Sequence, residues 1–348
     1  MPDASDRLPD PLEAFVDALP KVELHLHLEG SIAPTTLLAL ARRHPNSRLP
    51  QTLAALRELY RFRDFAHFIE VYRIVSEQLR DADDFALITR ELGATLAAQN
   101  VRYAEVTVTP LGHVRRGVAP EALFEGIERG RAEAEAEHGV RLRWCTDIDA
   151  AAGPEAAVET VQLVLAHRPE GLLSLGLGGL EQGVPRAQFA TAFAMGREAG
   201  LRSVPHAGEA AGAPFIWEAI RDLGAERIGH GIRCLDDPSL LAYLREHQLP
   251  LEVCPTSNVC TRVVPAMRDH PLPRLLAEGI TVTLNSDDPP MFATTLRCEY
   301  LTAARTLRLS PAALADLARA GVRAAFLDPS DAAALLAEID RIPLLLGP

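Results

Sequence analysis

The sequence predicts a single (β/α)8 barrel, a TIM barrel, over residues 1–348. Two observations carry this prediction. Eight short segments rich in Val, Ile, Leu or Thr recur along the chain, and segments with helical periodicity separate them. Strands that alternate with helices form parallel sheets, and eight such units close into a barrel. The 348 residues, 48% of them hydrophobic, are enough for one barrel with a large core.

Each expected strand is bounded by Gly, Pro, Asp or Asn. The strands lie near residues 21–28, 101–108, 141–148, 171–177, 202–206, 226–230, 250–254 and 281–285. The expected helices include 119–138, 154–167, 186–199, 214–223 and 237–247, and Pro154, Pro185 and Pro214 stand where a first helical turn tolerates proline. The long interval between the first two strands, 30–98, predicts extra helices that cover the site as a lid. An Ala- and Leu-rich helical tail is expected after residue 298.

The first expected strand carries the most informative motif, His25-Leu26-His27. Successive side chains of a strand point to opposite faces, so both histidines share one face while Leu26 lies on the other. Two imidazoles on one rigid element can hold one metal ion. The alternative is a pair of surface histidines on an edge strand.

Polar side chains also follow three later strands, at the point where each strand ends. They are His206 with Glu209, His230, and the pair Asp287 and Asp288. The carboxyl ends of barrel strands meet at one face, so these groups are expected to lie close to the His-x-His motif. Two histidines, a further histidine and an aspartate form a donor set suited to a catalytic zinc with one position open to water.

The remaining groups suit a hydrolytic reaction. His230 can orient a water molecule without being a ligand, and Glu209 begins a helix three residues after His206, where it can shuttle a proton. The alternatives are a structural histidine and a helix-start carboxylate. Strand alternation sends the side chains of Asp287 and Asp288 in different directions, so one can bind metal and the other substrate; the alternative is a solvated turn.

Composition excludes several classes of partner. The formal net charge of −12 argues against nucleic acid, because binding DNA or RNA needs a basic surface. The sequence has no apolar run of membrane-spanning length, and its first residues do not have the pattern of a signal peptide, so we expect a cytoplasmic protein without a membrane partner. No sequence feature indicates an oligomeric state. Five cysteines without a C-x-x-C pair fit reduced, mostly buried thiols; they are Cys145, Cys234, Cys254, Cys260 and Cys298.

Lys21 is the only lysine and lies at the start of the first expected strand. A Schiff-base lysine, a P-loop lysine and a carbamylated lysine that bridges two metals are therefore unlikely, because arginine does not deprotonate in proteins. This favours one metal ion over two. The histidines away from the strand ends are expected at the surface or at helix ends; they are His44, His67, His113, His138, His167, His247 and His270.

Together these motifs resemble the adenosine deaminase family of metal-dependent hydrolases. The matching stretches, in the order of the family, are LHLHLEG (24–30), HAGE (206–209), RIGHG (227–231), CPTSN (254–258) and NSDDP (285–289). The resemblance implies zinc-dependent hydrolytic deamination of a small-molecule 6-aminopurine. It implies that one Zn²⁺ ion is bound by His25, His27, His206 and Asp287.

The resemblance also implies roles for the other groups. Glu209 protonates purine N1, and His230 positions the attacking hydroxide, with Asp287 also placed among the catalytic residues. Asp288 contacts N7, and the backbone amide of Gly179 contacts N3. Glu29 stands near the 5′ side of a nucleoside ribose.

The substrate is the open part of this interpretation. Glu29 resembles the adenine deaminase branch, whereas residues 101–110 and 176–185 resemble the branch that deaminates 6-aminodeoxyfutalosine in menaquinone synthesis. That substrate carries a benzoate on a 5′ extension, and Arg61, Arg63 and Arg73 are candidates to bind its carboxylate. The preferred order is 6-aminodeoxyfutalosine, adenosine and then adenine. A catalytically silent purine- or metal-binding barrel, and a zinc amidase or lactonase, are the alternatives of other classes.

Overall fold

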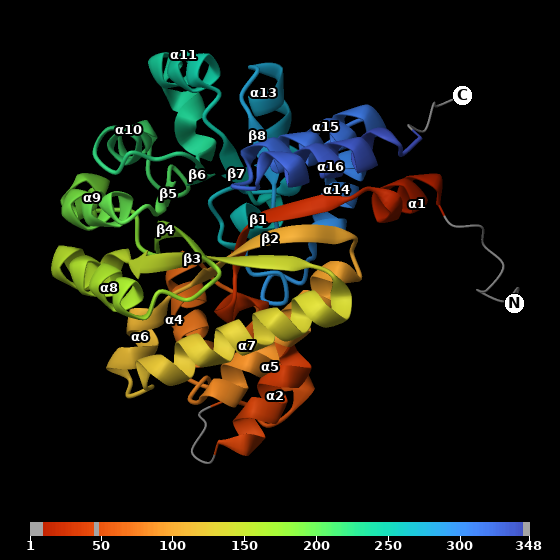
Figure 1. The fold of residues 1–348 in the computed structure, drawn as a ribbon. Coiled ribbons are helices and arrows are strands. Elements are labelled where there is room, and N and C mark those ends of the chain that lie inside the picture. The colour runs from red at the N-terminus through yellow and green to blue at the C-terminus, as the bar shows by residue number, and fades with distance from the viewer. Residues whose placement is uncertain (1–9, 45–48, 344–348) are drawn as a thin grey trace, which may run out of the picture.

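The computed structural model describes residues 10–44 and 49–343, so both ends of the expected domain, 1–9 and 344–348, lie outside the described residues. Eight parallel strands follow one another around a nearly closed barrel, as predicted (Figure 1). Each strand lies within two residues of its expected bounds. The strands are β1 (Lys21–His27), β2 (Val101–Val108), β3 (Arg141–Asp149), β4 (Leu172–Gly178), β5 (Arg202–Ala207), β6 (Ile228–His230), β7 (Leu251–Val253) and β8 (Val282–Leu284).

The barrel closes between β8 and β1 through the residues that follow β8. The N–H of Asp287 donates to the carbonyl of His25, and the carbonyl of Asp287 accepts from the N–H of His27, both at 3.0 Å. Asn285 Oδ1 accepts from the N–H of Leu24, also at 3.0 Å. The closure therefore fixes the backbone of Asp287 between the two histidines of the first strand.

Helices surround the barrel, and the helices expected from the sequence are present (Figure 1). The expected helix 186–199 is divided, because Pro185 precedes a 3-10 turn, η4 (Arg186–Phe189), before α9 begins. The helices after β2 are α6 (Pro110–Arg115), α7 (Pro120–His138), α8 (Gly153–His167), α9 (Ala190–Glu198), α10 (Ala213–Arg221), α11 (Pro238–His247), α12 (Pro255–Cys260), α13 (Leu272–Ala277), α14 (Leu296–Arg305), α15 (Pro311–Ala324) and α16 (Pro329–Asp340). Short 3-10 turns are η2 (Glu29–Ser31), η3 (Ala150–Ala152), η5 (Ile232–Asp236) and η6 (Met267–Asp269).

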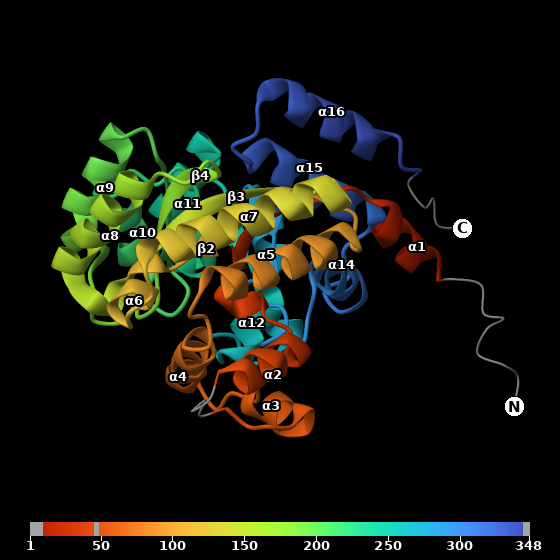
Figure 2. The ribbon, with the colours of Figure 1, turned by 60° about the horizontal axis from the view of Figure 1, so that its bottom comes forward.

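The long interval between β1 and β2 forms the extra helices predicted for it. After α1 (Pro11–Ala18) and β1, these are α2 (Pro34–Arg43), α3 (Leu53–Leu59), α4 (Phe65–Ser76) and α5 (Ala82–Ala97). Figure 2 shows α2, α3 and α4 grouped at one end of the barrel, whereas α5 runs beside α7. Among the described residues, none of these or the other helices is both long and apolar enough to cross a membrane.

The outward side of the barrel strands forms the core with the surrounding helices. Leu24 and Leu26 are buried on β1, and Trp144 on β3 is buried under α7 with its ring N–H donating to Glu128 at 2.7 Å. Each fully buried leucine contributes about 1.5–3 kcal/mol. This packing leaves the inward side of the strands to polar residues.

Candidate active site

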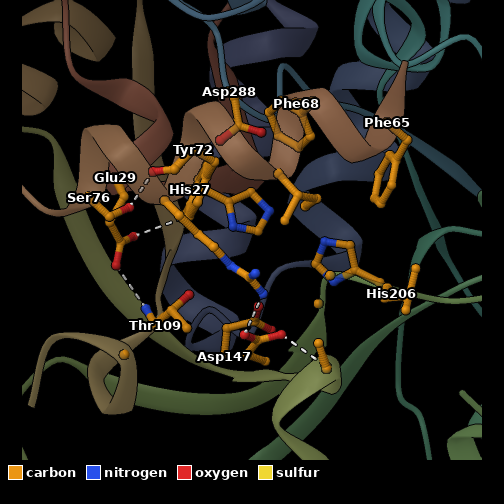
Figure 3. Close-up of a pocket in the computed structure, with 18 of the residues that line it drawn as sticks. His27, Glu29, Phe65, Phe68, Tyr72, Ser76, Thr109, Asp147, His206 and Asp288 are labelled. Atoms are coloured by element: carbon orange, nitrogen blue, oxygen red, sulfur yellow. Dashed lines mark hydrogen bonds and ion pairs between the residues drawn. The ribbon is translucent and has the colours of Figure 1, made fainter. Parts of the chain in front are cut away.

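A cavity of about 580 Å³ lies at the carboxyl end of the barrel, between the strand ends and α4 (Figure 3). The residues predicted as functional share this location. Eight line the cavity, namely His27, Glu29, Gly179, His206, Glu209, His230, Asp287 and Asp288. The ninth, His25, lies beside them, with its ring centroid 4.4 Å from that of His206.

The predicted metal ligands converge on one point. His25, His27 and His206 each offer a ring nitrogen, and these nitrogens lie within 4.8 Å of one another. Asp287 Oδ1 is 3.3 Å from His27 Nε2 and 3.6 Å from His25 Nε2. His25, His230 and Asp287 form a second group of the same kind, so the two groups surround one site.

The hydrogen bonds of His25 leave one ring nitrogen free, as a metal ligand requires. Its Nδ1–H donates to the carboxylate of Glu252 at 3.0 Å, which leaves the lone pair of Nε2 free. This Nε2 atom is buried and has no hydrogen-bond partner among the described residues. Three imidazoles and one carboxylate are the donor set of a catalytic zinc. The residues present therefore fit one divalent ion.

Glu252 is itself held by a buried arginine. Arg227 donates from Nε to Glu252 at 2.6 Å, and its Nη2 group contacts Glu105 on β2. The Arg227 guanidinium also stacks over the ring of Phe326, with 4.0 Å between its Cζ and the ring centroid. This network connects the interior of the barrel to the predicted metal ligand His25.

His230 ends β6 because its φ of +58° is in the left-handed region, where a strand cannot continue. Its Nδ1 accepts from the Asn258 amide at 3.2 Å, and Asn258 Oδ1 accepts from His270 Nε2 at 3.1 Å. His230 therefore carries its proton on Nε2, which lies 3.7 Å from Glu209 Oε2 and 3.7 Å from Asp287 Oδ2. This places an N–H donor within the site.

Glu209 is buried beside the predicted metal ligands. Burial raises the pKa of its carboxyl to about 7, so a large fraction is protonated at neutral pH. The loop that carries it is held by Glu181, which accepts from the N–H groups of Ala210 and Ala211, both at 2.7 Å. The sequence does not predict that Glu181 holds this loop. The only sequence feature that points to it is its place shortly after the end of a strand.

Asp287 and Asp288 contact different neighbours, although their carboxyl groups lie close together in the same cavity. Asp287 has a φ of +64° and faces the histidines, whereas Asp288 lies over Gly30. A Cβ added to Gly30 would lie 1.5 Å from Asp288 Oδ1, so only glycine leaves room for this carboxyl. Burial and the adjacent Asp287 raise the pKa of Asp288 well above its usual range, which favours the protonated form.

Glu29 faces the cavity with its carboxylate already bonded on both oxygens. Oε1 accepts from His113 Nε2 at 3.0 Å and from the N–H of Thr109 at 3.1 Å, and Oε2 accepts from the Tyr72 hydroxyl at 3.2 Å (Figure 3). Burial opposes ionisation of Glu29, but the interactions with His113 and the backbone N–H of Thr109 together outweigh burial and lower the pKa. The group therefore remains an acceptor.

Of the seven histidines expected at the surface or at helix ends, three lie at helix ends but are buried. His113 and His270 are buried in the networks above, and His44 is buried with its Nε2 2.7 Å from Asp84 Oδ2. Each partner is distant in the sequence from the histidine or lies on another element, so no local pattern reveals it. The other four histidines are partly or fully exposed.

The sequence analysis also missed Asp147, which lines the cavity from the end of β3. Its carboxyl lies over Gly176 and Gly178, where an added Cβ would come within 2.7 and 2.3 Å of its oxygens. Burial raises its pKa to about 7. Oδ1 has no hydrogen-bond partner among the described residues. The inward register of β3 is the signal that could have indicated this residue.

Of the three arginines expected to bind a carboxylate, only Arg73 lines the cavity. Its guanidinium is 3.3 Å from Asp149, so it already has an acidic partner. Arg61 is exposed and pairs with Glu58 at 3.3 Å, and Arg63 is exposed outside the cavity. The structure therefore does not place Arg61 or Arg63 at the cavity.

Comparisons with known proteins agree with this geometry. The chain is 51% identical over 331 residues to an aminodeoxyfutalosine deaminase from Streptomyces avermitilis, across 94% of this chain and 92% of that protein. An adenine deaminase from Arthrobacter aurescens has a crystal structure with a TM-score of 0.90 and 36% identity, covering 92% of this chain and 98% of that one. A crystal structure of an amidohydrolase from Burkholderia ambifaria with bound Zn has a TM-score of 0.89 and 27% identity, covering 97% and 96%. A family profile for adenosine deaminase matches residues 20–342, and the chain therefore belongs to the adenosine deaminase family.

Proposed function

We propose that this chain catalyses the metal-dependent hydrolytic deamination of a 6-aminopurine nucleoside. Water replaces the 6-amino group, which gives the 6-oxo purine and ammonia. The favoured substrate is 6-aminodeoxyfutalosine, an intermediate of menaquinone synthesis, followed by adenosine. The observation that carries the proposal is the convergence of nine sequence-predicted residues on one cavity. The 51% identity to an aminodeoxyfutalosine deaminase supports the choice of substrate.

One Zn²⁺ ion is the cofactor we propose, with His25, His27, His206 and Asp287 as its ligands. The free lone pair of His25 Nε2 and the Zn-bound relative support this assignment. When bound, the metal would supply an activated water nucleophile at neutral pH.

The protein groups provide the proton transfers and the orientation. Glu209 donates its proton to N1, which makes C6 electron-poor as the nucleophile attacks. The Nε2–H of His230 orients the attacking water. The protonated carboxyl of Asp288 donates to N7, and the N–H of Gly179 donates to N3. Ammonia leaves after a proton passes to the 6-amino group.

The partner is then a small molecule rather than a nucleic acid or a membrane. The five cysteines form no disulfide, which supports a reducing, cytoplasmic location. Free adenine is the third candidate, and the adenine deaminase from Arthrobacter aurescens supports keeping it. Values of kcat/KM for 6-aminodeoxyfutalosine, adenosine and adenine test the order. A strong preference for adenine would contradict a nucleoside substrate.

A non-catalytic purine-binding barrel is tested by the same assay. The ultraviolet shift from a 6-amino to a 6-oxo purine reports deamination directly. We expect the wild type to release ammonia and Glu209→Gln to lose at least about 100-fold in kcat, because general acid catalysis contributes about 10²–10⁴-fold. Ligand binding without turnover by the zinc-loaded wild type would contradict the proposed enzyme. Retained turnover in Glu209→Gln would remove only this residue from the reaction.

A further inference from the structure

Arg116 lies at the mouth of the cavity and has donors to spare. It follows the end of α6 and lines the cavity opposite α4. Its Nη2 group donates to His113 Nδ1 at 2.9 Å and lies 3.4 Å from the carbonyl oxygen of Ser76. Among the described residues, its Nε and Nη1 groups have no hydrogen-bond partner, and no carboxylate forms an ion pair with it, although Glu29 and Glu77 are close enough to interact with its charge. Three N–H donors are therefore available to a ligand.

A relay of hydrogen bonds fixes the position of this guanidinium. Arginine can only donate, so His113 Nδ1 must accept, and the proton of the imidazole lies on Nε2. That Nε2–H donates to Glu29 at 3.0 Å. His113 is buried, so Arg116 is held one imidazole ring away from Glu29. Glu29 follows the metal-ligand candidate His27 by two residues, which places Arg116 beyond the 5′ side of a bound nucleoside.

The other arginines nearby are already paired. Arg73, which also lines the cavity, pairs with Asp149 at 3.3 Å. Arg115, the neighbour of Arg116 in sequence, pairs with Glu159 at 2.5 Å outside the main cavity. Of the described arginines that line the cavity, Arg116 is thus the one without a direct ion pair to a carboxylate.

We propose that Arg116 binds the carboxylate of a nucleoside that carries an acidic 5′ extension. This inference rests on the proposed function, since it assumes that the purine lies at the metal ligands and the ribose beside Glu29. The free Nε–H or an Nη1–H can donate a charge-assisted hydrogen bond to one carboxylate oxygen. The two groups lie on different edges of the guanidinium, so the contact is a single hydrogen bond and not a parallel pair. Phe65, Ile69 and Tyr72 of α4 line the same cavity and suit the aromatic ring of a benzoate.

The test measures selectivity for the charge itself. We would compare kcat/KM for 6-aminodeoxyfutalosine and for its benzoate methyl ester, which differ only in the carboxylate. A hydrogen bond to a charged group predicts a preference of about 10- to 100-fold for the acid in the wild type. Arg116→Gln is expected to bring the acid-to-ester ratio close to 1, and Arg116→Lys to give an intermediate ratio, because lysine keeps the charge on a shorter, more flexible side chain that His113 does not hold in place.

Two matched variants complete the experiment. Arg115→Gln removes the adjacent guanidinium, and Arg73→Gln removes the other arginine of the cavity; both are expected to keep the wild-type ratio. Melting temperatures establish that each variant is folded. Equal losses for acid and ester in Arg116→Gln would overturn the inference, as would a collapse of the ratio in Arg73→Gln in place of Arg116→Gln.

Further outcomes separate this inference from the proposed function. If the wild type deaminates adenosine but does not distinguish acid from ester, only the carboxylate subsite is wrong. If it deaminates none of the purines, the proposed function fails and the inference with it. AMP is the third substrate, because its phosphate is the other common 5′ anion. A preference for AMP over 6-aminodeoxyfutalosine that Arg116→Gln abolishes would overturn the assignment to a carboxylate.

Discussion

Replacement of Arg227 by methionine is expected to destabilise the barrel by about 4 kcal/mol. Arg227, Glu105 and Glu252 are each 1% exposed, so all three charges are removed from water. Removal of one partner of a buried ion pair costs about 3–5 kcal/mol, because the other charge is left uncompensated. Here two carboxylates lose the same partner, and one must take up a proton or admit water.

The loss of stability converts to a measurable shift in melting temperature. Globular proteins unfold with an entropy of about 2.1 cal/mol/K per residue, so a chain of this length loses about 5 °C for 4 kcal/mol. Thermal unfolding followed by circular dichroism in the presence of a chelator measures this shift without a contribution from metal binding. Methionine keeps most of the side-chain volume, so the shift reports charge rather than a cavity.

Arg202→Met is the matched control. Arg202 stacks over the same Phe326 ring at 5.1 Å and pairs with Glu226 at 2.8 Å, but its side chain is 54% exposed. An exposed ion pair contributes about 0–1 kcal/mol, so the melting temperature of Arg202→Met is expected to stay within about 1–2 °C of the wild type. If the melting temperature of Arg227→Met falls no further than that of Arg202→Met, the buried ion-pair network does not stabilise the barrel by the expected amount.

Three further predictions concern the site. Gly30→Ala places a methyl group 1.5 Å from Asp288 Oδ1, so the Asp288 carboxyl must move. This displacement is expected to lower kcat/KM about 100-fold with little change in melting temperature. Wild-type values of kcat/KM in steady-state assays would exclude this role for the glycine. Because Glu209 acts as an acid and its pKa is raised to about 7, kcat/KM is expected to fall about tenfold per pH unit above neutrality, a limb that is absent in Glu209→Gln. Glu252→Gln weakens the hydrogen bond to His25 and is expected to reduce zinc affinity about 10- to 100-fold. Competition with a chromogenic chelator measures this affinity. An unchanged zinc affinity would show that Glu252 does not orient His25 for metal binding.

The parts of the site that the sequence predicts are those that depend on local geometry. The positions of His25 and His27 follow from strand alternation, and those of His206, His230 and Asp287 follow from their place at strand ends. These rules need only a register and a strand boundary. They therefore predict the barrel and the convergence of the ligands without knowledge of the tertiary contacts.

The groups that the sequence does not predict depend on contacts between distant segments. His113 is a helix-end histidine until Glu29, 84 residues earlier, supplies its partner. Arg116 was overlooked because the interval between the first two strands was expected to provide the arginines of the lid, whereas Arg116 follows the second strand. The role of Asp147 can be recognised only from the tertiary structure, because Gly176 and Gly178 of the neighbouring strand leave room for its carboxyl.

The barrel closure and the site depend on the same interactions. Glu23 is buried inside the barrel and accepts from Ser286 N–H at 2.9 Å and from Ser286 Oγ at 3.1 Å. The next residue, Asp287, has a φ of +64°, a conformation that costs about 1–3 kcal/mol for a side chain other than glycine. The hydrogen bonds on either side of Asp287 offset this strain only when β8 pairs with β1. The carboxylate is therefore oriented toward the histidines as a consequence of closing the barrel, so the same hydrogen bonds that complete the sheet also bring the proposed ligands together.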